Sequence, residues 1–100
     1  MVKARRVVWD DFARAALKIA YNHIKEDSPQ QAEKVKQDIL AATRKLSDHP
    51  EMHPADKYRK DKDTRFRAFE KHNYRISYLI TEDRIRVLRL RHVKQEPKDY

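Results

Sequence analysis

The sequence contains no cysteine and no glycine. Without cysteine, the chain can form no disulfide framework, no zinc–thiolate site and no cysteine nucleophile. Without glycine, it lacks the P-loop and the dinucleotide-binding fingerprint, which need glycine where the backbone approaches phosphate. Tight turns must then use Asn, Asp, His or Pro. The five histidines show no metal-ligand spacing, so we expect neither a metal nor a cofactor.

Long apolar runs are also absent. The N-terminal segment MVKARRVVWDD carries basic residues but no apolar stretch that would suit a signal peptide or a membrane span. We therefore expect a cytoplasmic protein without a membrane partner. The 100 residues suffice for a single domain, residues 1–100, with one modest core. Hydrophobic residues make up only 39% of the chain, but their periodic spacing favours folding over disorder.

Positive charge is abundant and concentrated in the last third of the chain. The formal net charge is +8 and the sequence pI is about 9.8. Seven arginines lie between Arg65 and Arg91, where they alternate with aliphatic residues. This alternation predicts a sheet with one cationic face, which could hold phosphate or an acidic partner.

The first half of the chain carries the signals of one strand and two helices. The β-branched run Arg5–Trp9 predicts a strand, and Asp10 or Asp11 then caps a helix that extends to about Lys25. The segment Ser28-Pro29-Gln30-Gln31 begins a second helix, because serine can accept from the amide three residues on and proline suits the first helical position. This second helix is expected to end at Ser47-Asp48-His49-Pro50.

The second half predicts a loop followed by three strands. The polar segment His49–Thr64 is expected to be a surface loop, and the strands are expected at Arg65–Lys71, Tyr74–Thr81 and Arg84–Arg91. His72-Asn73 and Glu82-Asp83 lie where hairpin turns are needed, and Asn and Asp tolerate positive φ. In the last strand the apolar residues change faces part of the way along. We predict an α+β domain of order β-α-α-β-β-β, with a helical hairpin packed on a mainly antiparallel sheet.

Three stretches resemble the RelE/ParE superfamily of type II toxins: WDDFARAALKIAYNHIKEDSP, RAFEKHNYRISYLI and IRVLRLRH. The resemblance covers nearly the whole chain. It implies a growth-inhibiting toxin that is neutralised by a small, partly disordered antitoxin. The charge of +8 suits an acidic antitoxin. Formation of a homo-oligomer is left open.

The superfamily divides into two mechanisms. RelE-like members resemble ribonucleases that cut messenger RNA in the ribosomal A site, so their partners are the ribosome and mRNA. ParE-like members are not enzymes; they bind DNA gyrase and trap it on broken DNA. We expect a RelE-like mRNA endonuclease first, with a ParE-like gyrase poison as the close alternative. A non-catalytic nucleic-acid-binding module is the third interpretation.

RNA cleavage needs a base, an acid and cations that neutralise charge on phosphorus. The resemblance assigns phosphate contact to Arg75, and Arg67 on the neighbouring strand is the second candidate. His92 is the candidate for proton transfer, because its unperturbed pKa lies near neutrality. Tyr100 matches a tyrosine beyond the last strand that could act as base or stack on a nucleobase. We expect Arg75→Ala to relieve toxicity while the fold and antitoxin binding stay intact.

The other candidate nucleic-acid contacts are the remaining cations of the strands and the residue beyond them. Their guanidinium and ammonium groups suit phosphate oxygens. They are Arg65, Arg86, Arg89, Arg91 and Lys94.

The sequence departs from the RelE-like pattern at two places. RelE-like sites carry two cations on the strand before the Tyr-Arg motif, whereas Ala68 and Phe69 follow Arg67 here. The basic residue expected just past the last strand is replaced by Val93-Lys94. The hydrophobic-x-His ending of IRVLRLRH fits ParE-like toxins at least as well.

Each candidate site residue also has a structural interpretation. Arg75 could instead pair with Glu70 or Asp99 within the fold. His92 at a strand end could cap backbone groups, and Tyr100 could be frayed as the final residue.

Overall fold

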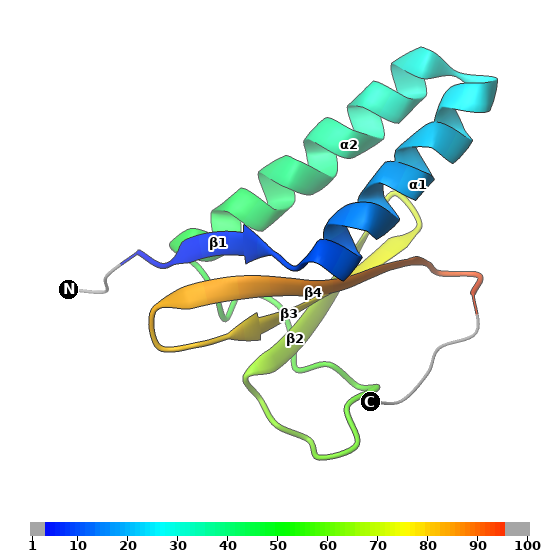
Figure 1. Cartoon of the computed structure of the whole chain (residues 1–100). Coiled ribbons are helices and arrows are strands. Elements are labelled where there is room, and N and C mark those ends of the chain that lie inside the picture. Colours follow the sequence, from blue (N-terminus) through cyan, green and yellow to red (C-terminus); the bar gives the residue numbers. More distant parts are fainter. Residues whose placement is uncertain (1–3, 96–100) are drawn as a thin grey trace.

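The computed structural model describes residues 4–95, in which two helices lie on one side of a four-stranded sheet (Figure 1). The elements follow the predicted order β-α-α-β-β-β, and each predicted boundary is confirmed to within a few residues. Their bounds are β1 (Arg6–Trp9), α1 (Asp11–Asp27), α2 (Pro29–Arg44), the 3₁₀ turn η1 (Lys45–Ser47), β2 (Phe66–Lys71), β3 (Tyr74–Ile80) and β4 (Arg84–His92). No helix in the described range is both long and apolar enough to cross a membrane.

The sheet has the strand order β1-β4-β3-β2, so the first and last strands of the chain are neighbours. β1 runs parallel to β4, and the other two pairs are antiparallel. The pairing of β1 with β4 runs from Arg6 opposite Arg84 to Trp9 opposite Val87. Beyond Trp9 the chain turns into α1, so the second half of β4 runs beneath α1 instead of beside β1 (Figure 1).

The helical hairpin turns at Ser28, as predicted. The Ser28 hydroxyl accepts a hydrogen bond from the Gln31 amide at 3.1 Å, and Pro29 occupies the first helical position. The Ser28 amide donates to the Ile24 carbonyl and closes the end of α1. One residue therefore ends the first helix and caps the second.

The two β-hairpin turns form without glycine, and they do so in different ways. His72 and Asn73, between β2 and β3, have φ angles of 52° and 69°, as predicted for this turn. Glu82 and Asp83, between β3 and β4, have no positive φ, contrary to expectation. There the Thr81 hydroxyl bonds to both the amide and the carbonyl of Arg84, so a side chain closes the turn.

A β-bulge in β4 changes which residues of the strand are buried. Odd-numbered residues face the helices before the bulge, and even-numbered residues face them after it. Ser77 pairs with Arg89, but the next residue, Tyr78, pairs with Val87, so β4 contains one extra residue. Ile85 and Val87 before the bulge and Leu90 after it all face the helices. The predicted change of face along this strand is therefore wrong: the extra residue at the bulge keeps the apolar side chains on the covered face of the sheet.

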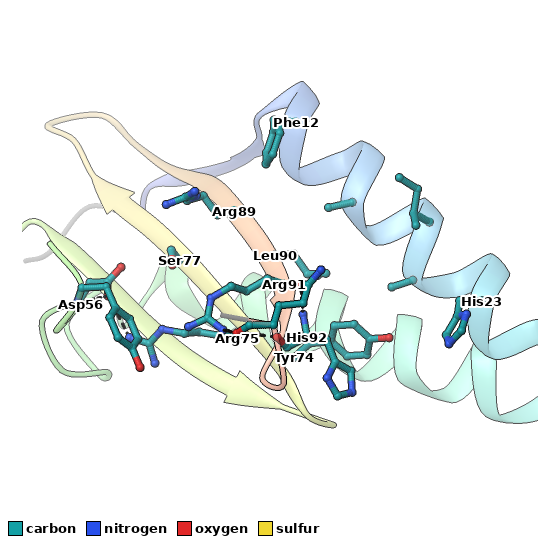
Figure 2. Close-up of a pocket in the computed structure, with 15 residues that line it drawn as sticks. Phe12, His23, Asp56, Tyr74, Arg75, Ser77, Arg89, Leu90, Arg91 and His92 are labelled. Carbon is teal, nitrogen blue, oxygen red and sulfur yellow. Dashed lines mark hydrogen bonds and ion pairs between the residues drawn. The ribbon is translucent and has the colours of Figure 1, made fainter. Parts of the chain in front are cut away.

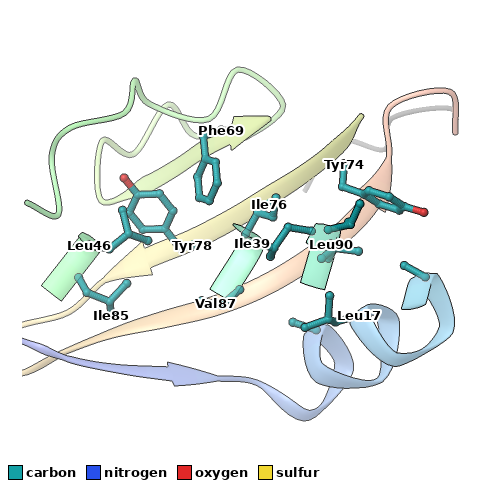
Figure 3. Packing of buried hydrophobic residues seen from close by; sticks show 13 residues of the cluster. Leu17, Ile39, Leu46, Phe69, Tyr74, Ile76, Tyr78, Ile85, Val87 and Leu90 are labelled. Carbon is teal, nitrogen blue, oxygen red and sulfur yellow. The ribbon is translucent and has the colours of Figure 1, made fainter. Parts of the chain in front are cut away.

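The core lies between the helical hairpin and the covered face of the sheet (Figure 3). Burial of these apolar side chains supplies the main stabilisation of the fold. The core cluster consists of Ala13, Leu17, Ala20, Val35, Ile39, Leu46, Phe69, Tyr74, Ile76, Tyr78, Ile85, Val87 and Leu90.

The loop between η1 and β2 covers the outer edge of the sheet. Ala55 forms an antiparallel bridge with Arg67 of β2, the Asp56 amide donates to the Phe66 carbonyl at 2.8 Å, and the Ala68 amide donates to the Pro54 carbonyl at 3.3 Å. This short stretch pairs with the edge strand β2, whose backbone groups would otherwise be open to another strand. It also brings Asp56 against the face of the sheet that the helices leave uncovered.

Candidate functional site

A groove of about 560 Å³ lies between α1 and the uncovered face of β3 and β4 (Figure 2). Its volume is in the range of small-ligand sites. The groove exists because β1 ends at Trp9, so the second half of β4 has α1 as its neighbour on that side.

One wall of the groove is an apolar face of α1. Phe12 and Ile19 are 70% and 69% exposed, and Ala16 lies between them. Positions seven apart share one side of a helix, so these residues form a continuous stripe. His23 lies at the far end of this wall (Figure 2). Phe12 and Ile19 lie outside the core stripe of Ala13, Leu17 and Ala20, whereas Ala16 and Ala20 line the groove and also pack in or against the core.

The opposite wall is cationic. Arg75 of β3 lies directly opposite Arg91 of β4, and Ser77 lies opposite Arg89. These four side chains project from the face that does not contact the core, because their strand neighbours Ile76 and Leu90 are buried beneath the helices. Three guanidinium groups therefore lie along one wall of the groove (Figure 2).

A buried ion pair closes one end of this wall. The Arg75 Nη2 atom lies 3.0 Å from Asp56 Oδ1, and the two side chains are 10% and 1% exposed. The Arg75 Nη1 atom lies 3.5 Å from the Glu70 carboxylate, so the predicted structural alternative for Arg75 is present as well. The Nε atom of Arg75 is buried and has no hydrogen-bond partner within the described part of the chain.

The ring of Tyr58 covers two of these arginines. The guanidinium carbons of Arg75 and Arg91 lie 4.8 Å and 5.3 Å from the ring centroid. The Tyr58 amide donates to Asp56 Oδ1 at 3.0 Å, which orients the loop. Cation–π contact with an aromatic face stabilises each guanidinium and holds the loop against the sheet.

His92 lies at the end of β4 beside the groove. Its ring meets the edge of Tyr74 with centroids 5.2 Å apart, and its Nδ1 atom accepts from the Lys94 amide at 3.1 Å. An accepting Nδ1 places the proton of the neutral ring on Nε2. His92 thus caps a backbone group, which is its structural interpretation. The group that it caps is the backbone amide of Lys94.

Arg67 lies on the other face of the sheet. It pairs with Tyr78, whose side chain is in the core, whereas Arg75 pairs with Glu70 on the uncovered face. The Arg67 guanidinium donates to the carbonyls of His53 at 2.7 Å and Thr64 at 3.0 Å. The structure therefore does not bring Arg67 and Arg75 to one ligand.

Two further predicted nucleic-acid contacts, Arg65 and Arg86, lie outside the groove. Each of them pairs with an aspartate of the protein. Arg65 binds Asp63 at 2.7 Å, which lowers the pKa of that carboxyl to about 2. Arg86 forms two hydrogen bonds with Asp10, at 3.1 Å and 2.7 Å, and this carboxylate raises the pKa of the guanidinium. Tyr100 lies outside the described residues.

Four of the predicted site residues come together in the groove. They are Arg75, Arg89, Arg91 and His92. The residue pattern did not point to the other groove residues, among them Asp56 and Tyr58 from the loop and Phe12, Ala16 and Ile19 from α1. Within residues 4–95 no group of three or more His, Asp or Glu residues is arranged to hold a metal ion.

Comparison with known proteins identifies the family. A family model described as the ParE toxin of the type II toxin–antitoxin system, parDE, matches residues 7–97. A solved structure described as a chromosomal ParDE toxin–antitoxin system from P. aeruginosa has the same fold. The TM-score is 0.70 at 20% sequence identity, and the match covers 91% of this chain and 98% of that chain. No curated protein matches the sequence. This chain therefore belongs to the ParE toxin family of type II toxin–antitoxin systems.

Proposed function

We propose that this toxin acts without catalysis, by binding DNA gyrase and trapping it on broken DNA, and that an acidic antitoxin neutralises it. The observation that carries the proposal is the placement of the two phosphate candidates. Arg67 and Arg75 lie on opposite faces of the sheet, and Arg75 is buried against Asp56. The match to the ParE toxin family favours the same mechanism, because the ParE-like branch of the superfamily targets gyrase.

The chemistry of RNA cleavage explains why this placement matters. The phosphorus gains negative charge in the transition state, and catalysis requires cations, an acid and a base that converge on one phosphate. Asp56 already neutralises Arg75, and its carboxylate would oppose the approach of a second anion. The Arg67 guanidinium donates to two carbonyl groups of the loop between η1 and β2. To bind a phosphate it would have to leave these carbonyls, which would break the loop contacts.

An antitoxin partner follows from the family and from the charge. The similar structure from P. aeruginosa is described as a ParDE toxin–antitoxin system, and we propose a cognate antitoxin for this chain as well. A net charge of +8 favours an acidic partner, and opposite charges accelerate association.

A ribosome-dependent mRNA endonuclease remains the second candidate. The observation in its favour is that His92 lies beside the groove that Arg75, Arg89 and Arg91 line. A histidine and three arginines that line one groove are the kinds of group that phosphate chemistry uses.

One experiment separates the two mechanisms in cells. The toxin is expressed from an inducible promoter in growing bacteria, and DNA breaks, the SOS response and transcript integrity are followed together. We expect DNA breaks and an SOS response while transcripts remain intact. An uninduced culture is the control, and a quinolone serves as the positive control for gyrase-dependent breaks. Transcripts cut within codons, without DNA breaks, would reject gyrase poisoning in favour of the endonuclease.

A further inference from the structure

The sheet has one edge at which the backbone of the outer strand is open. β1 is the outer strand beside β4, whereas the opposite edge, at β2, is covered by the bridge between Ala55 and Arg67 (Figure 1). Within residues 4–95, no strand pairs with the outer side of β1. An open edge is a template for a further strand, and native proteins usually cover such an edge or pair it.

The backbone groups on this edge belong to Val7 and Trp9. The Asp10 amide donates to the Val87 carbonyl of β4 at 2.9 Å. In a parallel pair, alternate residues of a strand direct their backbone groups to the neighbouring strand, so those of Val7 and Trp9 point outward. The Trp9 carbonyl accepts from Arg14 Nη2 at 3.2 Å and has a second lone pair. An added antiparallel strand must therefore bond to Val7 and Trp9.

The sequence around this edge is complementary to its own reverse. Residues 5–11 read RRVVWDD, which is two cations, three apolar residues and two anions in order. In the antiparallel register that places Val7 opposite Trp9 of a second copy, Arg6 lies opposite Asp10 of that copy. Opposite charges and an aromatic ring beside a β-branched residue are cross-strand pairs that stabilise a sheet. The register that matches the outward backbone groups therefore also pairs opposite charges.

The surroundings of β1 suit this pairing on both faces of the sheet. A hollow of about 370 Å³ lies beside the strand, and Leu17 and Leu40 of the helices line it, so apolar side chains of a second strand would contact apolar surface. On the other face Arg6 is exposed. The Asp10 carboxylate already binds Arg86, and its remaining lone pairs can accept from a second guanidinium.

We propose that two copies of this chain pair through β1, antiparallel and centred on Val8, and thereby join their sheets into one continuous sheet. The copies are related by a two-fold axis perpendicular to the sheet, so every contact occurs twice. The paired strands are four residues long, and the net charge of +8 on each copy opposes association. We therefore expect a weak dimer, with a dissociation constant of about 10–100 µM. The inference concerns the free toxin and is independent of its cellular target.

A single introduced cysteine tests the register, because the chain has no cysteine of its own. The two Val8 residues form a non-hydrogen-bonded pair, whose Cα atoms are expected about 4.5 Å apart, within the range of a disulfide. We expect Val8→Cys to form a covalent dimer in a glutathione redox buffer. Thr64→Cys is the matched control for random collision, since Thr64 is exposed near the opposite edge of the sheet. It should form far less covalent dimer.

The variants Arg6→Glu and Lys60→Glu test the charge pairing. Both change the net charge equally, but Lys60 is an exposed residue of the loop that covers the β2 edge. Arg6→Glu places like charges opposite each other at both ends of the interface and should weaken the dimer by at least about tenfold. Lys60→Glu should not weaken it. Sedimentation equilibrium over a dilution series measures both dissociation constants.

Three outcomes would overturn the proposal. Equal yields of covalent dimer from Val8→Cys and Thr64→Cys would show that Val8 does not lie at a two-fold axis. Equal dissociation constants for the wild type and Arg6→Glu would show that the dimer does not use the Arg6–Asp10 pairs. A wild type that stays monomeric at about 1 mM would leave the β1 edge to a strand of another protein. Amide spectra of native dispersion are required of every variant, and none of these outcomes depends on whether the toxin poisons gyrase.

Discussion

Asp56 and Arg75 form a buried ion pair at 3.0 Å that joins the loop before β2 to the uncovered face of β3. Removal of one partner from a buried pair leaves an uncompensated charge and typically destabilises a protein by about 3–5 kcal/mol. We therefore expect Asp56→Asn to lower the free energy of unfolding by about 3 kcal/mol or more. Chemical denaturation followed by circular dichroism measures the change.

The exposed pair of Asp83 and Arg84 is the control for this prediction. Its atoms lie 3.4 Å apart, and the side chains are 72% and 50% exposed. Exposed pairs contribute little to stability, so Asp83→Asn should lower the free energy of unfolding far less than Asp56→Asn does. Equal losses for Asp56→Asn and Asp83→Asn would show that the Asp56 pair is not buried in solution.

The same pair changes how an Arg75 variant must be interpreted. From the sequence we expected Arg75→Ala to relieve toxicity with the fold intact. Since Arg75 holds Asp56, Glu70 and Tyr58, its removal should instead destabilise the loop and the sheet face. Loss of toxicity in this variant therefore does not assign a functional site unless the thermal midpoint is measured alongside. An unchanged thermal midpoint in a non-toxic Arg75→Ala variant would support the interpretation of Arg75 as a functional residue.

The buried hydroxyl of Tyr78 ties the sheet to the loop. It donates to the Pro50 carbonyl at 2.8 Å, and burial raises the pKa of Tyr78 to about 12. Tyr78→Phe should destabilise the fold by about 1–2 kcal/mol, because it leaves a buried acceptor without its donor. Tyr21→Phe is the matched control, since the contact of the Tyr21 hydroxyl with Glu33, at 3.4 Å, is exposed. Denaturation midpoints that fall equally for both variants would contradict this account.

His53 should make stability depend on pH in a narrow window. Its ring stacks on Phe69 with centroids 4.4 Å apart, and burial lowers the pKa of His53 below its ordinary value near 6.5. In the window between the two pKa values the unfolded chain binds more protons than the folded one. Stability should thus fall as the pH drops through about 6.5 towards the lower folded pKa.

The variant His53→Phe isolates this effect. It keeps an aromatic ring against Phe69 but cannot take up a proton. We expect the stability of the wild type relative to this variant to decrease between pH 7.5 and 5.5, as thermal unfolding at a series of pH values would show. The other histidines titrate in both proteins and cancel in the comparison. A constant difference across this range would mean that His53 has the same pKa in the folded and unfolded states.

The strands and helices could be predicted because their signals are local. Ser28 and Pro29 mark a helix start, and His72-Asn73 marks a turn that needs positive φ. The opposite faces of Arg67 and Arg75 could also have been predicted. A two-residue turn pairs Lys71 with Tyr74, and counting back in register places Arg67 opposite the buried Tyr78.

The groove could be predicted only in part. Phe12 and Ile19 lie off the core stripe of α1, and apolar residues outside such a stripe are a usable signal of a second surface. The contact between Asp56 and Arg75 could not be predicted, because it depends on how a polar loop folds over the sheet edge. Nothing in the local sequence distinguishes Asp56 from the other acidic residues of that loop.

The most direct test of the central claim uses purified toxin, purified gyrase, ATP and supercoiled plasmid. The reaction is stopped with detergent and protease, and linear plasmid is measured on a gel. In parallel, the toxin is added to ribosomes translating a defined messenger RNA. Gyrase poisoning predicts linear plasmid that requires both gyrase and toxin, with intact messenger RNA. Unbroken plasmid together with messenger RNA cut within codons would contradict it.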